Sequence, residues 1–189
     1  MEKKCYTIAS TFPELSVLGK TSRDLRETLS DNKISFKRPG LGDHVTYAAP
    51  FFMKEDNANW LAKGLHIANV FASKSDHCLA EIDSCSFLGE SNEAFVILLK
   101  TTWDFRRMVE YLRASIPYED WVYPPDRFSL YAHATIAEAA GNKFSFKKEV
   151  ETIDESTLSR IILLGIMVRF DPPKVYEKKD SGKWAPVHF

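Results

Sequence analysis

The sequence predicts an α+β fold in which helices are mixed with mostly antiparallel strands. Apolar residues recur at helical spacing in residues 59–71 and 103–116. Other segments read as pairs of strands joined by short turns, at residues 79–99 and 175–187, and short turns join antiparallel strands. The order also repeats loosely, because each half of the chain has a strand that carries a histidine, with a helix and further strands nearby.

The N-terminal segment is expected to form a strand and then a helix. Residues 6–9 read as a short strand. Thr21 or Ser22 is expected to cap the helix that follows, because hydroxyl side chains accept hydrogen bonds from the first free backbone amides of a helix. Leu25 and Leu29 lie at the spacing of its apolar face.

A second strand and a second helix follow. The turn-rich, basic segment 37–42 is expected to be a loop. It leads into a strand at residues 44–49, which Pro50 is expected to end because proline donates no backbone hydrogen bond. The helix predicted at residues 59–71 comes next.

The middle of the chain is expected to contain a hairpin and a third helix. Residues 79–88 and 94–99 are predicted strands, joined by a turn at residues 89–92. The second of these strands is apolar throughout, which is typical of a buried strand. The helix predicted at residues 103–116 stops near Pro117.

The C-terminal third is expected to consist mainly of strands. Residues 130–137 are a predicted strand, and the strongly apolar segment 160–169 is predicted to be another. Residues 144–157 are compatible with either a helix or a strand. The last element, residues 175–187, is a predicted hairpin that turns at residues 180–182.

Length and charge limit the organisation and the partners. The 189 residues suit one domain or two small lobes that share a core, and we expect a single bilobal domain over residues 1–189. The 25 Lys and Arg residues nearly balance the 26 Asp and Glu residues, for a net charge of -1. Overall charge therefore cannot drive non-specific binding to nucleic acid, so any anionic ligand must be held by a local site.

Three cysteines, Cys5, Cys78 and Cys85, are odd in number and form no CxxC motif. This pattern argues against a disulfide framework and a structural zinc site. We recognise no signal peptide, and the longest apolar run, residues 161–168, is too short to span a bilayer. We therefore expect a protein of a reducing compartment, the cytoplasm or the nucleus, without membrane association.

One tripeptide pattern occurs twice, as His44-Val45-Thr46 and as His133-Ala134-Thr135. Side chains alternate along a strand, so the histidine and the threonine of each copy point to the same face. If the two strands lie side by side, two imidazoles and two hydroxyls converge on one cleft. One copy alone would most simply be the polar face of a half-buried strand, but two copies in matching contexts favour a site.

The chemistry of this cleft suits a phosphodiester. Imidazole titrates near pH 6.5, so near neutral pH one histidine can be a neutral base while the other is a protonated acid. Threonine hydroxyls can donate hydrogen bonds to the non-bridging phosphate oxygens. This scheme needs no metal ion and no other cofactor.

Both tripeptides, the hairpin and helix between them, and the closing hairpin resemble the 2H phosphoesterase superfamily, which includes the LigT-like RNA 2′,3′-cyclic phosphodiesterases, also called 2′-5′ RNA ligase-like proteins. The resemblance covers nearly the whole chain, but only the tripeptides are specific. It implies two lobes related by pseudo-two-fold symmetry, with mostly antiparallel sheets around a central cleft. It also implies that His44 and His133 are the acid/base pair and that Thr46 and Thr135 hold the phosphate.

The activity implied by this resemblance is a metal-independent phosphoesterase that hydrolyses 2′,3′-cyclic phosphate ends of RNA or nucleotides. The partner would be RNA or a nucleotide with such an end or with a 2′-linked phosphodiester, and we expect the protein to be a monomer. RNA ligation, the reverse reaction, stays open. The same chemistry would also suit a 2′-5′ oligoadenylate or a cyclic oligonucleotide.

Several further side chains are weaker candidates for substrate contact. Aromatic rings could stack on a base or could equally be packing residues. Glu138, rather than a basic residue, follows the second motif, so an arginine from elsewhere in the chain could contact the phosphate instead. These candidates are Tyr47, Phe51, Trp121, Tyr123, Tyr131 and Arg169. Trp184, in the last hairpin, is expected to serve packing.

Two alternatives from other classes remain. The first is a non-catalytic RNA-binding or nucleotide-binding module that uses the same cleft. The second is an interaction domain in which the two motifs are a coincidence, which predicts that the two histidines lie far apart.

Overall fold

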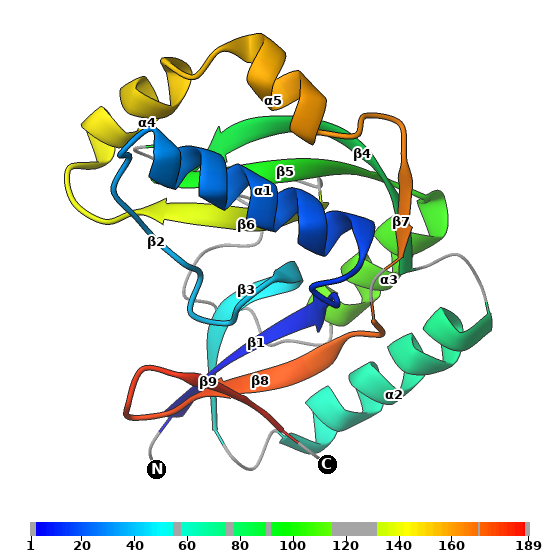
Figure 1. Cartoon of the computed structure of the whole chain (residues 1–189). Coiled ribbons are helices and arrows are strands. Elements are labelled where there is room, and N and C mark those ends of the chain that lie inside the picture. Colours follow the sequence, from blue (N-terminus) through cyan, green and yellow to red (C-terminus); the bar gives the residue numbers. More distant parts are fainter. Residues whose placement is uncertain are drawn as a thin grey trace.

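Nine strands of the described chain form a sheet in which every pairing is antiparallel (Figure 1). The computed structural model describes residues 3–54, 58–74, 78–89, 92–114, 132–169 and 171–187. The strands are β1 (Lys3–Thr11), β2 (Phe36–Lys37), β3 (His44–Lys54), β4 (Leu79–Leu88), β5 (Ala94–Thr101), β6 (Ala132–Ala139), β7 (Met167–Arg169), β8 (Lys174–Lys178) and β9 (Trp184–Pro186). The expected α+β class is confirmed.

The sheet consists of two halves that meet at its centre. The strand order is β7-β4-β5-β6-β3-β1-β8-β9, with β2 paired to β6. Read outward from the centre, one half is β3, β1, β8 and β9, and the other is β6, β5, β4 and β7. Among the described residues, one ladder pair joins the halves, Val45 opposite Ala134. The described strands therefore form one continuous sheet with a narrow seam at its centre.

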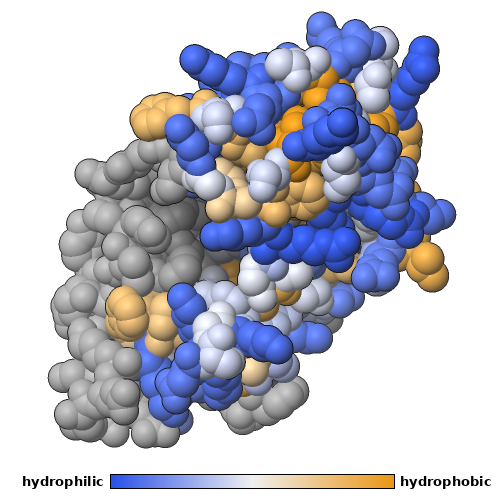
Figure 2. Space-filling model, turned by 60° about the vertical axis from the view of Figure 1, so that its left-hand side comes forward, coloured by the Kyte–Doolittle hydropathy of each residue, from blue (hydrophilic) through white to orange (hydrophobic). Residues whose placement is uncertain are grey.

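Five helices of the described chain cover this sheet: α1 (Val17–Asp31), α2 (Ala58–Lys74), α3 (Trp103–Ala114), α4 (Lys143–Glu151) and α5 (Glu155–Ile161). Helix α1 contacts β6 and α5, whereas α3 contacts β3 and α2. Figure 1 accordingly shows α1, α4 and α5 with the half of the sheet that contains β6, and α2 and α3 with the half that contains β3. Among the residues that are coloured in Figure 2, hydrophilic ones predominate, and apolar ones gather mainly on the upper part of this face. No described helix is both long and apolar enough to cross a membrane.

The first helix begins earlier than expected. Ser16 is its N-cap, and the Ser16 hydroxyl accepts a hydrogen bond from the Gly19 amide at 3.1 Å. Thr21 and Ser22 lie inside the helix with buried side chains, so the expectation that one of them caps it is wrong. Ser16, Thr21 and Ser22 all precede Leu25 and Leu29, and the N-cap is Ser16, whose backbone is extended, with φ -66° and ψ 162°.

Strand β3 continues past Pro50 to Lys54, so the prediction that Pro50 ends it is wrong. The register of β1 against β3 slips between Tyr6 and Ile8, and the residues of β3 opposite this slip include Pro50. A bulge leaves one residue without a ladder partner, which is where a strand tolerates a residue that lacks an N–H group.

Residues 160–169 do not form one long strand as predicted. Helix α5 continues to Ile161, and only Met167–Arg169 forms a strand, β7, at the edge of the sheet. Gly165 interrupts the segment with a φ of 75°, a left-handed conformation that favours glycine. The apolar run is also partly exposed, since Leu163 and Leu164 are 46% and 60% accessible to solvent. Apolar character alone therefore misled the prediction of a buried strand.

The ambiguous segment 144–157 consists of parts of two helices, α4 and α5. Asn142 caps α4 by accepting a hydrogen bond from the Phe144 amide at 3.0 Å. The other predicted helices and strands are present, including the final hairpin with its turn at residues 180–182, and residues 79–88 form β4 as predicted. The expected helix end near Pro117 and the expected strand start at residue 130 lie outside the described residues. The two-residue strand β2 was not predicted.

Candidate active site

The two His-x-Thr motifs lie side by side at the seam of the sheet. Their central residues, Val45 of β3 and Ala134 of β6, are opposite one another and have no solvent exposure. Because side chains alternate, the histidines and threonines on either side of this pair project to the other face. Continued for one residue, the antiparallel register places His44 opposite Thr135 and Thr46 opposite His133. The structure therefore excludes the alternative in which the two histidines are far apart.

All four motif side chains line one pocket with a volume of about 320 Å³. Its walls come from β1, the loop between β2 and β3, β3, β6 and β9. The described lining residues are Thr7, Pro39, Gly40, Leu41, His44, Thr46, His133, Thr135, Glu138 and Trp184. Thr7 and Thr135 are buried, whereas His44, Thr46 and His133 are half-buried and reach the cavity. The pocket thus combines imidazoles and hydroxyls on rigid central strands.

One hydrogen bond of His44 fixes which nitrogen of its neutral ring carries the hydrogen. The His44 Nδ1 atom is 2.7 Å from the carbonyl oxygen of Gly42. A carbonyl oxygen can only accept, so Nδ1 carries the hydrogen and Nε2 of the neutral ring has the free lone pair. Burial lowers the pKa of His44, while the Gly42 carbonyl and the Asp43 carboxylate act in the opposite direction. Neutral His44 is therefore favoured, with Nε2 as its basic atom.

A tight turn aims the Gly42 carbonyl at this ring. Gly42 has a φ of 78°, which a residue with a side chain rarely adopts, and its amide donates to the Pro39 carbonyl at 2.9 Å. The next residue, Asp43, accepts two hydrogen bonds from the Arg26 guanidinium of α1, at 2.6 Å and 3.0 Å. Both side chains are largely buried, so the turn is anchored to a helix.

A β-bulge brings Glu138 into the pocket. On β6, Thr135 is opposite Val96 and Ala137 is opposite Phe95, so Ile136 is an extra residue without a partner. One extra residue shifts the alternation and re-aims Glu138 to the face of His133 and Thr135, where it lines the cavity. The pKa of Glu138 is raised, mainly by burial. Lys37, opposite it on β2, acts to lower this pKa, and Glu93 acts to raise it.

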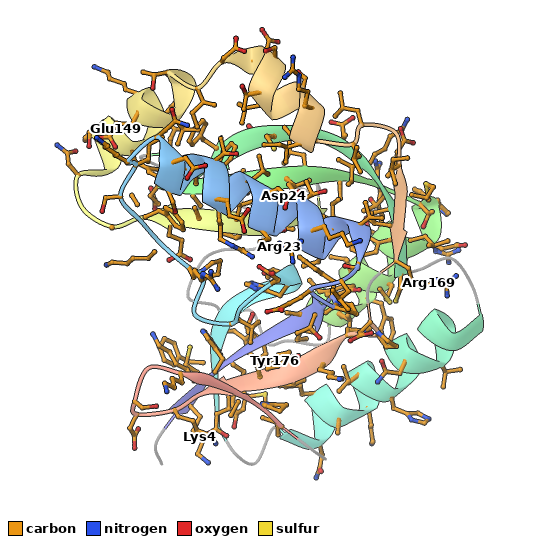
Figure 3. All side chains as sticks on the ribbon, in the orientation of Figure 1. Lys4, Arg23, Asp24, Glu149, Arg169 and Tyr176 are labelled. Atoms are coloured by element: carbon orange, nitrogen blue, oxygen red, sulfur yellow. The ribbon has the colours of Figure 1, made fainter. Side chains whose placement is uncertain are left out.

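Three weaker candidates lie elsewhere. Tyr47 is fully buried, accepts a hydrogen bond from Ser10 at 2.8 Å and packs on Phe105 of α3. Phe51 is also fully buried, so a substrate cannot reach either ring. Arg169 does not line the pocket; it lies on β7 at the far edge of its half-sheet (Figure 3). Trp121, Tyr123 and Tyr131 fall outside the described residues.

The position of Tyr47 could have been inferred from the sequence. Tyr47 follows Val45 by two residues, so the alternation that joins His44 to Thr46 places Tyr47 on the opposite face. Trp184, in contrast, was expected to serve packing but lines the pocket, half-buried. Its indole stands against Gly40, where an added Cβ would lie 3.6 Å from the Trp184 Cδ1 atom. No local signal in the sequence joins Trp184 to this loop.

The fold is shared with solved structures of low sequence identity. No family model matches this sequence, and no curated protein matches it. Escherichia coli LigT complexed with ATP superposes with a TM-score of 0.56 at 10% identity, over 100% of this chain and 96% of that one. Usb1 from Kluyveromyces marxianus gives 0.61 at 9% identity, over 99% of both chains. A structure described as a phosphoesterase gives 0.53 at 12% identity, over 99% of this chain and 97% of the other. These matches confirm the 2H phosphoesterase fold that the two motifs implied.

Proposed function

We propose that this protein is a phosphoesterase that hydrolyses 2′,3′-cyclic phosphates of nucleotides or RNA ends with two histidines and without a metal ion. The observation that carries the proposal is the pairing of Val45 with Ala134, because it puts both His-x-Thr motifs on one pocket. Proteins of the same fold bind nucleotides: E. coli LigT has been crystallised with 3′-AMP and K. marxianus Usb1 with uridine monophosphate.

The two histidines have different roles in this mechanism. His44 is the general base, since its Nδ1 hydrogen is held by Gly42 and burial favours its neutral form. Its Nε2 atom accepts a proton from water, and the water oxygen bonds to phosphorus. His133 is the general acid and donates a proton to the ribose oxygen as the bond from phosphorus to that oxygen breaks. The product is a phosphate monoester and a free ribose hydroxyl.

Thr46 and Thr135 hold the phosphate during this step. They flank the histidines on the same face of the seam, and their hydroxyls donate hydrogen bonds to the non-bridging oxygens, where negative charge increases in the transition state. Both threonines sit on central strands, so these donors are positioned before the substrate binds. Removing one such donor costs about 10²–10³ in kcat in other enzymes.

The test is turnover of a small panel in EDTA. The panel contains adenosine 2′,3′-cyclic phosphate, an RNA oligomer that ends in a 2′,3′-cyclic phosphate, and 2′-5′ oligoadenylate. The wild type is compared with His44→Ala and His133→Ala, and His66→Ala serves as the matched control because His66 is exposed on α2.

We expect either pocket substitution to reduce turnover at least about 10²-fold, the lower end for an acid or base catalyst, and His66→Ala to leave it unchanged. Activity that survives both pocket substitutions contradicts the mechanism. Tight nucleotide binding by the wild type without turnover of any panel member would instead identify a binding module.

A further inference from the structure

Glu138 places a negative charge close to the proposed phosphate position. On β5, the partners of Thr135 and Glu138 are Val96 and Ala94, two residues apart. Two residues of an antiparallel strand span about 7 Å, so Glu138 is separated by about that distance along the strand from the threonine that would hold the phosphate, which is comparable with the length of a nucleoside. The bulge at Ile136 is what turns this carboxylate to the pocket side of β6.

Two charged residues lie next to Glu138. Lys37 faces it across the β2–β6 ladder, and the carbonyl oxygen of Glu93 accepts the Ala139 amide at 2.8 Å. Glu138 is the one of these three residues that lines the pocket. A phosphate placed here would meet its carboxylate, whereas a hydroxyl would find an acceptor.

Another residue of the pocket lining suits a base. Trp184 lies on β9 against Gly40 and lines the same cavity as Glu138. An indole offers an apolar flat surface, and nucleobases stack on such surfaces without regard to sequence. With the base on Trp184 and the cyclic phosphate between His44 and His133, the 5′ side of the ribose is left to face Glu138.

We propose that Glu138 makes this pocket selective for free nucleoside 2′,3′-cyclic phosphates with a 5′-hydroxyl, and against RNA ends, whose last nucleotide has a phosphodiester on its 5′ oxygen. The carboxylate accepts a hydrogen bond from the 5′-hydroxyl and repels a 5′-phosphate. The inference rests on the proposed function and names the substrate class within it.

The first test compares adenosine 2′,3′-cyclic phosphate with the same nucleotide bearing a 5′-phosphate. Two charges about 8 Å apart near a protein surface change an equilibrium by about threefold to thirtyfold, so kcat/KM of the wild type should favour the 5′-hydroxyl form by that factor. Glu138→Gln should bring the ratio close to one, and Glu138→Lys should invert it. Glu151→Gln, which neutralises an exposed carboxylate on α4 outside this pocket, should keep the wild-type ratio.

A binding measurement separates this inference from the proposed function. Calorimetry gives the Kd of adenosine 3′-monophosphate and of adenosine 3′,5′-bisphosphate for the wild type and Glu138→Gln, whether or not the protein is catalytic. If the wild type binds the bisphosphate more weakly than the monophosphate and Glu138→Gln binds the two equally, the selection by charge is supported even if no cyclic phosphate is hydrolysed. Turnover with equal preference for both nucleotides, or a preference that Glu138→Gln leaves intact, overturns the inference and leaves the phosphoesterase proposal standing.

Discussion

The guanidinium of Arg26 on α1 binds both carboxylate oxygens of Asp43, at 2.6 Å and 3.0 Å, immediately before His44. The two side chains are only 8% and 14% exposed. Bidentate pairing fixes the direction of Asp43 as well as its distance. The turn that orients the His44 ring is therefore held by a helix from elsewhere in the chain.

Replacing Arg26 should reduce both stability and activity. Arg26→Met leaves the Asp43 carboxylate buried without its partner, which costs about 3–5 kcal/mol in comparable buried pairs. Arg26→Lys should recover only part of this loss, since lysine cannot form the two-pronged contact. Urea unfolding measures the free energy, and kcat of the folded fraction measures the effect on His44. A free energy of unfolding equal to that of the wild type in Arg26→Met would contradict a structural role for this pair.

Activity should fall on the acid side at a pH below the ordinary titration of histidine. Burial lowers the pKa of His44, so its basic form persists below the usual value of about 6.5. The midpoint of the acid limb of kcat/KM should lie below that value. A midpoint above it would contradict the assignment of His44 as the base.

The same shift affects stability. The unfolded chain takes up a proton on this histidine at a higher pH than the folded protein does, so the folded state loses stability as the pH falls through the interval between the two pKa values. Above that interval the contribution is fully present. The pH dependence of the unfolding free energy should be shallower in His44→Gln than in the wild type, and identical slopes would show that His44 does not titrate differently in the folded state.

The role of the turn before His44 in catalysis can be tested by replacing each of two glycines that share the same backbone conformation. Gly42 and Gly165 have φ values of 78° and 75°, and neither position would place a new Cβ within 4 Å of another atom. Alanine at either position should cost about 1–2 kcal/mol. Only Gly42→Ala should also lower kcat, because only Gly42 holds the Nδ1 hydrogen of His44. Thermal unfolding and steady-state kinetics of both variants check this, and equal kinetics would separate the turn from catalysis.

Trp184 should contribute to binding more than to chemistry. Stacking of one base on an aromatic side chain is worth about 1–3 kcal/mol, which corresponds to about a 5- to 150-fold rise in KM for Trp184→Ala. Trp184→Phe should recover much of the affinity, and kcat should change far less than KM. Trp103→Ala is the control, since Trp103 is 69% exposed on α3 and does not line the pocket. An unchanged KM in Trp184→Ala would remove the indole from the substrate site.

The alternation of side chains along a strand was sufficient to predict that the histidine and the threonine of each motif lie on the same face. It places His44 with Thr46 and His133 with Thr135, and turn residues with paired strands predicted both hairpins. These features depend on neighbouring residues, so they can be recognised in one sequence. The adjacency of the two motifs depends on a pairing between distant strands, and only their resemblance to each other suggested it.

The features that the sequence did not reveal are irregularities and long-range contacts. The bulge at Ile136 changes which face Glu138 occupies, and no residue type marks it. Pro50 lies within a strand because the ladder slips there. The run around Leu163 is apolar but exposed, because α5 and Gly165 carry it over the surface. The first two outcomes depend on pairing between strands that are distant in the sequence, and the third depends on where α5 ends.

The pair of Val45 and Ala134, the one ladder pair between the two halves in the described part of the chain, has a mechanical consequence. Each half of the sheet supplies one imidazole and one hydroxyl, so neither half alone has a complete site. A nucleotide bound between His44 and His133, as proposed, would contact both halves and hold them together. By mass action it stabilises only the joined form, so a saturating ligand should slow amide exchange most strongly along β3 and β6, where the two halves would otherwise separate.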